Sequence, residues 1–239
     1  MSNLKNMLRW EFILLARYKI IHISILSVLL YFLTTQAVQS LKGQTDVHSV
    51  LLFFDPATIG FVFLGALVFF EKSENVLQAL VITPMNTDDY LFSKILSLTL
   101  LSIISASLFM GLMMIFNETS FNVFYLAVGV ILTSVMLILV GFILISRVMS
   151  INGYLLGMMI GFLGLTFPPM IQLFGLYQSP IFYLWPTHAS FVLFEGVFNA
   201  TSLEVWEIAY GIIYQVFWII VLYYFAKKSF YKHIVLKGG

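Results

Sequence analysis

The sequence contains no cysteine and few charged residues for its length. Charged side chains make up 10% of the 239 residues, against about 25% in an average soluble domain. The lack of cysteine excludes a disulfide framework, a thiolate metal site and a cysteine nucleophile. The net charge is only +1, so no strong basic field attracts nucleic acid. These values exclude a soluble globular domain, a disordered chain and a nucleic-acid-binding protein.

Motifs for catalysis and metal binding are also missing. The sequence has no Gly-x-Ser-x-Gly elbow, no His-Glu-x-x-His pair and no phosphate-binding Gly-x-x-x-x-Gly-Lys-[Ser/Thr] loop. Its four histidines are scattered. We therefore expect no catalytic residue and no metal site in this chain. If it moves a solute uphill, the energy must come from another subunit.

Apolar sequence is abundant. Hydrophobic residues make up 61% of the chain, the mean hydropathy is +1.00, and a helical membrane span needs about 20 such residues. The predicted fold class is therefore all-α: a polytopic membrane protein with six transmembrane helices in one domain, residues 1–239. The expected spans cover residues 20–38, 50–70, 90–116, 121–145, 152–174 and 206–226.

The distribution of lysine and arginine predicts the orientation. With the N-terminus in the cytoplasm, eleven of these residues fall inside and only Lys42 falls outside, which is a strong positive-inside bias. An even number of spans then places both termini in the cytoplasm. The prediction is a multi-pass protein of the cell membrane, in contact with lipid.

Residues 1–18 have the pattern of an amphipathic helix that lies flat on the membrane surface. Leu4, Leu8 and Leu15 share an apolar face, and the basic residues lie opposite. Glu11 breaks the pattern because it falls on the apolar face. We consider two explanations for Glu11: an ion pair with a neighbouring Arg or Lys, or a contact with a partner protein.

Residues 71–89 predict a short cytoplasmic helix between the second and third spans. Ser73 is a suitable N-cap, Glu74 suits the first turn and Pro84 ends the helix. Leu77 and Leu80 lie on one apolar face. A helix that simply rests on the membrane surface is the alternative.

The fifth span carries glycines at Gly153, Gly157 and Gly161, a spacing that produces a smooth strip for close helix packing. The strip packs against another span of the same chain, or it lines a path or faces a second chain. Pro168 and Pro169 are expected to kink or break the outer part of this span.

Residues 175–205 are too apolar for an aqueous loop and too interrupted for a straight span. Because irregular backbone at membrane depth must be shielded, we expect a re-entrant segment on the outer side. Pro186, His188 and Glu195 are its candidate gate residues. Solvation at the membrane interface is the alternative role for His188 and Glu195.

The 71–89 segment carries a family resemblance. The pattern Glu71-Lys72, Leu77-Gln78-Ala79-Leu80, Thr83-Pro84, Tyr90-Leu91 and Lys94 resembles the loop between the second and third spans of ABC transporter permeases of type 2. Ser73-Glu74-Asn75 stands where that family often has Gly-Thr. The leader, with Leu8-Arg9-Trp10-Glu11, is most similar to small bacterial permeases described as fluoroquinolone or multidrug exporters. The resemblance covers the whole chain.

The resemblance implies a mechanism. Two permease chains, as a homodimer or a heterodimer, surround a path, and each docks on an ABC ATPase subunit. The short cytoplasmic helix couples ATP-driven closure to the spans, so coupling residues would be Glu71, Glu74, Leu77, Leu80 and Pro84, with Glu11 as a further candidate. ATP and Mg would be held by the ATPase, not by this chain.

The chain is rich in Phe (24 residues) and Met (11 residues). Adaptable apolar surfaces of this kind suit varied hydrophobic ligands, so we expect a hydrophobic or amphipathic substrate such as a drug, a lipid or a peptide. A non-transporting membrane binding or immunity protein of the same fold remains the alternative. A membrane-embedded enzyme would need a polar constellation that the spans do not show.

Overall fold

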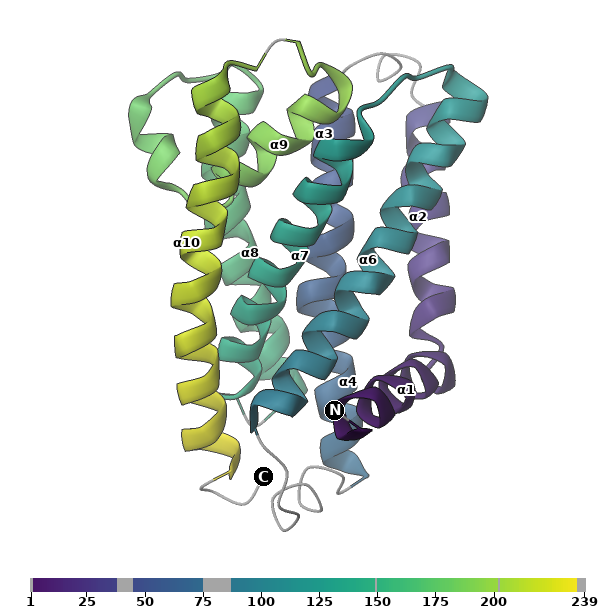
Figure 1. Ribbon diagram of the computed structural model, residues 1–239, viewed down its shortest axis with the longest axis vertical. Coiled ribbons are helices and arrows are strands. Elements are labelled where there is room, and N and C mark those ends of the chain that lie inside the picture. The colour runs from purple at the N-terminus through teal and green to yellow at the C-terminus, as the bar shows by residue number, and fades with distance from the viewer. Residues whose placement is uncertain (1, 38–44, 75–86, 149, 202, 236–239) are drawn as a thin grey trace.

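The computed structural model describes residues 2–37, 45–74, 87–148, 150–201 and 203–235, and these residues form an all-helical structure (Figure 1). No strand occurs among the described residues. Six helical segments in them are long and apolar enough to cross a membrane. The all-α fold with six candidate spans is therefore confirmed.

The observed spans follow the predicted ones closely. They are α2 (Ile20–Ala37), a composite second span from Thr45 to Ser73, α6 (Thr87–Asn117), α7 (Val123–Ile145), α8 (Ile151–Leu173) and a last span from Val205 to His233 that contains α10 (Val205–Phe230). Two shorter elements, the 3-10 helix η3 (Pro180–Leu184) and α9 (His188–Phe198), precede α10. A π-helical turn, η4 (Tyr231–Val235), follows it.

The leader forms the predicted helix, α1 (Ser2–Arg17), which lies across one end of the bundle and packs on α6 and α2 (Figure 1). Lys19, in the left-handed backbone region at φ 58°, makes the turn between α1 and α2. We call this end of the molecule the α1 end and the opposite end the α9 end. The described chain begins and ends toward the α1 end (Figure 1).

The second span is not one regular helix. It consists of α3 (Thr45–Thr58), the π-helical turn η2 (Ile59–Phe63) and α4 (Leu64–Ser73). Pro56 lies inside α3, where it removes a backbone donor. At η2 the span passes very close to α7, because a Cβ on Gly141 would lie 2.5 Å from the carbonyl oxygen of Gly60. Only glycine permits this crossing.

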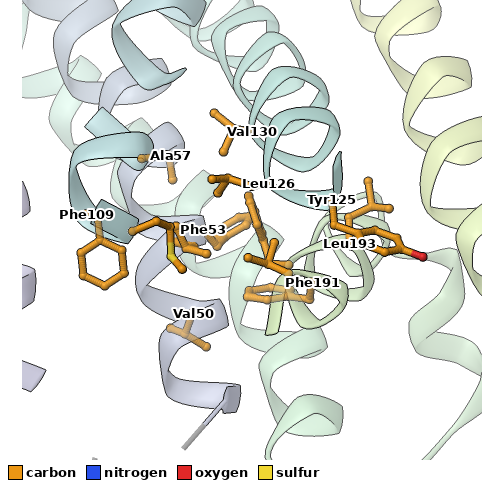
Figure 2. Close-up of a cluster of buried hydrophobic side chains, with 14 of the residues drawn as sticks. Val50, Phe53, Ala57, Phe109, Tyr125, Leu126, Val130, Phe191 and Leu193 are labelled. Carbon is orange, nitrogen blue, oxygen red and sulfur yellow. The ribbon is translucent and has the colours of Figure 1, made fainter. Parts of the chain in front are cut away.

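α7 is the central helix, in contact with α3, η2, α6, α9 and α10. Two apolar clusters fill the interior, one toward each end. In the cluster toward the α9 end, Phe191 and Leu193 of α9 meet side chains of α3 and α7 (Figure 2). The rings of Phe53 and Phe191 stack with centroids 4.5 Å apart. α9 is therefore an interior element rather than a surface loop.

The peripheral spans leave large apolar surfaces uncovered. The most apolar window of α8 is only 17% buried and that of the last span only 11% buried, against 72% for the second span. Such uncovered helices match a chain surrounded by lipid, since lipid accepts apolar side chains without cost.

Candidate functional site

Apart from the glycine strip of α8, the predicted functional residues that the structure describes fall into two groups, one at each end of the molecule. Glu11, Glu71 and Glu74 lie at the α1 end, and Pro186, His188 and Glu195 lie at the α9 end. Leu77, Leu80 and Pro84 lie outside the described residues, as does the predicted short helix that contains them. Their proposed coupling role stays a prediction.

A buried charge cluster of Glu11, Glu71, Tyr90 and Lys94 joins three helices at the α1 end. Lys94 Nζ in α6 lies 3.0 and 2.9 Å from the two carboxylate oxygens of Glu11 in α1 and 2.5 Å from Glu71 Oε1 in α4. The Tyr90 hydroxyl donates to Glu71 Oε2 over 2.7 Å. The three protons of the ammonium therefore match three carboxylate oxygens.

All four side chains in this buried charge cluster are almost completely shielded from solvent: Lys94 is 0% exposed and Glu11 only 5%. A buried charge without a partner costs several kcal/mol, so the pairs fix α1 against α4 and α6. Burial raises the pKa of the Glu11 carboxyl, and the nearby Glu71 carboxylate adds to this rise while Lys94 opposes it.

The cluster explains the position of Glu11 on the apolar face of the leader. Its partner is a lysine, as one of the two sequence-based explanations held, but that lysine lies 83 residues away. In this conformation the carboxylates of Glu11 and Glu71 face Lys94. Glu74 differs, because it lies at the surface and forms an ion pair with Arg17 of α1 over 3.4 Å.

Sequence reasoning did not assign Tyr90 and Lys94 to this cluster. The available signal was their spacing: residues four apart on a helix share one face, and an isolated lysine near a span start needs a partner. Asp88 lies in the first turn of α6. It accepts hydrogen bonds from Tyr223 and Lys227 of α10, each over 2.7 Å, and so joins α6 to the last span.

At the α9 end, residues 183–187 form a strap that side chains hold to two spans. The hydroxyls of Tyr210 and Tyr214 in α10 donate to the backbone carbonyls of Tyr183 and Leu184, each over 2.7 Å. Trp185 Nε1 donates to the Gly164 carbonyl over 2.8 Å, and the Thr187 hydroxyl donates to the Leu165 carbonyl. Pro186 is half-buried within the strap.

Of the two outcomes predicted for the prolines of α8, a kink or a break, the structure excludes the break. Pro168 and Pro169 do not break this span, because α8 continues through both of them to Leu173. Prolines at these positions leave the carbonyls four residues earlier, at Gly164 and Leu165, without their helical donors. Those are the two carbonyls that Trp185 and Thr187 reach. The strap therefore supplies the missing hydrogen bonds.

His188 is buried at the start of α9, only 6% exposed. Its ring lies 4.5 Å from the Tyr183 ring, and Nδ1 lies 3.4 Å from the Tyr210 hydroxyl. Burial lowers the pKa of His188 to about 4. Both roles considered for His188, gating and solvation at the membrane interface, stay predictions.

A small polar cavity of about 180 Å³ adjoins the strap. Three carboxylates contribute to its lining, from Asp46, Glu195 and Glu207, together with Gln172, Tyr183 and His188. Burial raises the pKa of Glu195, and the carboxylates of Asp46 and Glu207 raise it further. The predicted gate residues His188 and Glu195 thus share one cavity. The structure does not test whether they gate anything.

The glycine strip of α8 is not closely packed within this chain. A Cβ on Gly157 or Gly161 would have only the Leu144 side chain within 4 Å, at 3.9 and 3.7 Å. A Cβ on Gly153 would meet mainly the helix's own N-cap, Ser150. The strip therefore remains available to lipid, a path or a second chain.

Asp55 is a buried acid in α3, within the second span. Its Oδ1 accepts a hydrogen bond from Ser105 over 2.5 Å, and Ser24 donates to Ser105 over 3.3 Å. Oδ2 is buried without a hydrogen-bond partner. Among the described residues, no group of three or more His, Cys, Asp or Glu side chains is arranged to hold a metal ion.

Comparison with known proteins identifies the family. The model of the fluoroquinolones export permease protein family matches residues 2–238. Two curated proteins from Mycobacterium tuberculosis, strains CDC 1551 / Oshkosh and H37Rv, are each 30% identical over 240 residues, covering 100% of this chain and 99% of their own length. Both are described as fluoroquinolones export permease proteins. No solved structure matches. The chain belongs to the fluoroquinolones export permease protein family.

Proposed function

We propose that this chain is the membrane subunit of an ATP-binding-cassette exporter, which carries a hydrophobic or amphipathic substrate by alternating access. Membership of an export permease family supports a transport role. The sequence has no phosphate-binding loop, so ATP and Mg would bind to a separate ATPase subunit. This chain then contributes the path and responds to the ATPase, without catalysing a reaction itself.

The observation that carries this proposal is the buried charge cluster at the α1 end. Glu71 lies near the end of the second span and Lys94 lies in the first part of the third, so their ion pair joins the two helices that flank residues 75–86. A force applied to the intervening segment is transmitted to the spans only if both attachments are rigid. The Glu11–Lys94 pair extends the same rigid unit to α1.

The ATPase contact would then lie on Leu77, Leu80 and Pro84, with Glu74 at its exposed edge. Glu11 and Glu71 would not touch the ATPase. They would hold in place, through Lys94, the helices that carry the ATPase contact. This assignment keeps all six predicted coupling residues: Glu11 and Glu71 are buried and Glu74 is exposed, and the contact role of Leu77, Leu80 and Pro84 is part of the proposal.

A second permease chain, identical or related, would complete the path. α8 is largely uncovered, and its strip at Gly153, Gly157 and Gly161 accepts a close neighbour because no bulky side chain blocks it. In a bacterial cell membrane, with both termini cytoplasmic, the α1 end would face the ATPase. Pro186, His188 and Glu195 would then face outward, where they would close the path.

The names of the two relatives make fluoroquinolones the first substrate class to test. An amphipathic compound suits the chain on two counts. The spans offer abundant Phe and Met, and the cavity beside the strap offers carboxylates next to a tyrosine ring.

The test is co-expression with the ABC ATPase encoded beside this chain. We expect a detergent-stable complex whose ATPase activity rises with a fluoroquinolone. Leu77→Asp with Leu80→Asp should abolish co-purification and leave the melting temperature of the permease unchanged. The matched control is Ser73→Asp, which adds a carboxylate to an exposed position at the same end.

Two results would contradict the proposal. A complex that tolerates both aspartates moves the ATPase contact elsewhere. Failure to bind any ABC ATPase rejects the transporter assignment and favours a membrane protein that binds its ligand without turnover.

A further inference from the structure

A basic pocket opens at the α1 end between the end of α7 and the end of the last span. It measures about 440 Å³ and is lined by Arg147, Phe225, Lys228, Ser229, Lys232 and His233. No carboxylate belongs to this lining. The pocket is separate from the buried charge cluster and from the cavity beside the strap.

The cations of this pocket lack acidic partners. Within the described part of the chain, Arg147, Lys228 and Lys232 make no ion pair. Their neighbour Lys227 differs, because it pairs with Asp88 over 2.7 Å. Cations placed together without counter-charges repel one another, and an anion bound between them relieves this repulsion.

Arg147 is held in place by a directed chain of hydrogen bonds. Its Nε donates to the Ser229 hydroxyl over 3.3 Å, the Ser229 and Ser146 hydroxyls lie 2.6 Å apart, and Ser146 donates to the Ile143 carbonyl over 3.1 Å. Because a hydroxyl has one proton, Ser229 must donate to Ser146. The terminal guanidinium nitrogens are left to face a ligand.

Ser229 is the centre of this arrangement. It is 5% exposed, and its carbonyl oxygen lies 2.9 Å from His233 Nδ1. Since a carbonyl only accepts, Nδ1 carries a proton. Basic residues also favour helix C-termini for electrostatic reasons, which accounts for their presence here. This preference for helix C-termini does not explain why an arginine and a histidine both form hydrogen bonds with one buried serine.

The pocket lies beside a membrane-facing surface. Phe225, in its lining, is 47% exposed, and Ile220, further along α10, is 67% exposed. A ligand with an anionic head and an apolar tail therefore satisfies both the cations and the helix surface next to them. Guanidinium groups bind phosphate oxygens through two parallel hydrogen bonds, and basic pockets between membrane helices bind anionic lipid headgroups.

We propose that this pocket is a binding site for the phosphate of an acidic phospholipid headgroup. Arg147 binds the phosphate, Lys228 and Lys232 supply further positive charge, and Ser229 positions Arg147. The acyl chains lie along the exposed face of α10. The site does not depend on the transport function, because it needs neither an ATPase nor a substrate.

The experiment measures lipid binding to the purified full chain in detergent by native mass spectrometry. The probes are dioctanoyl phosphatidylglycerol, dioctanoyl phosphatidylcholine and inorganic phosphate. The first variant, Arg147→Gln with Lys228→Gln and Lys232→Gln, removes three cations. Its control, Arg9→Gln with Lys19→Gln and Lys72→Gln, removes the same charges from exposed positions at the same end. The second variant, Ser229→Ala, keeps every charge, and Ser73→Ala is its control.

We expect phosphatidylglycerol to bind more tightly than phosphatidylcholine. The first variant should weaken phosphatidylglycerol binding on the order of 100-fold, since each of the three basic residues near a membrane surface contributes about fivefold. Ser229→Ala should weaken it roughly fivefold by releasing Arg147. Both control variants should stay within about twofold of the unchanged chain.

Equal binding of the two lipids, or an equal loss in the first variant and its control, would overturn the proposal. Tight binding of inorganic phosphate alone would make the pocket a phosphate site rather than a lipid site. Unchanged lipid binding with lost ATPase co-purification would make it a protein contact. If the first variant does not fold, Arg147→Lys decides, because it keeps the charge and should still weaken phosphatidylglycerol severalfold.

Discussion

The ammonium of Lys94 lies 2.9 Å from the carboxylate of Glu11, although the two residues are 83 positions apart in the chain. The pair connects the leader helix to the third span inside the protein, where both residues are at least 95% buried. With Glu71 as a second carboxylate on the same ammonium, the site has one cation for two acids. Each substitution that alters this charge balance should therefore change the free energy of unfolding in a direction that can be predicted.

Lys94→Met should strongly destabilise the protein, because it leaves two buried carboxylates next to each other without a cation. Removing one partner of a buried ion pair costs about 3–5 kcal/mol. The measurement is the free energy of unfolding in mixed micelles. Lys72→Met, at an exposed position of the same end, should change it by less than about 0.5 kcal/mol.

The charge explanation is checked by combining Lys94→Met with Glu11→Gln and Glu71→Gln. Removing all three charges should recover much of the lost stability, since neutral replacements of buried ion pairs are often tolerated. If the triple variant is no more stable than Lys94→Met alone, lost packing rather than charge accounts for the defect.

The strap at the α9 end gives a second prediction. Thr187→Val leaves the Leu165 carbonyl without a donor and should cost about 1–3 kcal/mol. In a Pro169→Ala background, residue 169 has an N–H that can bond the same carbonyl along the helix. The cost of Thr187→Val should then fall below about 0.5 kcal/mol, so the two changes should couple in a double-mutant cycle. Strictly additive effects would show that Thr187 does not replace the missing proline donor.

The sequence was sufficient to predict the six spans and the leader helix. Runs of about 20 apolar residues have few other stable arrangements, and the 3.6-residue periodicity of the leader is independent of its partners. The same local reasoning wrongly allowed a break at Pro168 and Pro169. The hydrogen bonds that keep α8 intact come from Trp185 and Thr187, which no local pattern connects to these prolines.

The candidate site was predictable only in part, for the same reason. Glu11 stood out because it violated an apolar face, but nothing near it in sequence identified Lys94. His188 and Glu195 were chosen as titratable groups in an apolar stretch, and their shared cavity depends on how α9 folds back onto α3 and α8. Long-range pairing is decided by tertiary packing, which periodicity does not encode.

Two glycine substitutions, one at the crossing of η2 and α7 and one away from it, should change the free energy of unfolding in opposite directions. Gly141→Ala places a Cβ 2.5 Å from the Gly60 carbonyl oxygen and 2.8 Å from Leu64 Cδ2. The helices must separate, so a loss of about 1–3 kcal/mol is expected. Gly111→Ala in α6 meets nothing within 4 Å and should stabilise the helix by about 0.5–1 kcal/mol. Both values come from unfolding titrations in the same micelles.

His188 predicts a defined dependence of stability on pH. Its pKa is lowered from 6.5 to about 4 because burial disfavours the charged ring. Between these two values the unfolded chain binds a proton that the folded chain does not, so the free energy of unfolding falls as the pH drops. The titration of His188 therefore costs no stability above about pH 6.5, and it lowers the free energy of unfolding progressively as the pH falls to about 4.

His188→Gln should therefore reduce the acid sensitivity of the protein across that window, measured as the difference in melting temperature between the unchanged chain and the variant at each pH. Using the difference cancels the titration of carboxylates present in both proteins. His22→Gln, at an exposed position, should leave the acid sensitivity unchanged. If the His188→Gln profile runs parallel to that of the unchanged chain, the imidazole is protonated in the folded protein. The counter-charges would then be Glu195 and Glu207, which share its cavity, and the α9 end would carry an ion pair instead of a neutral ring.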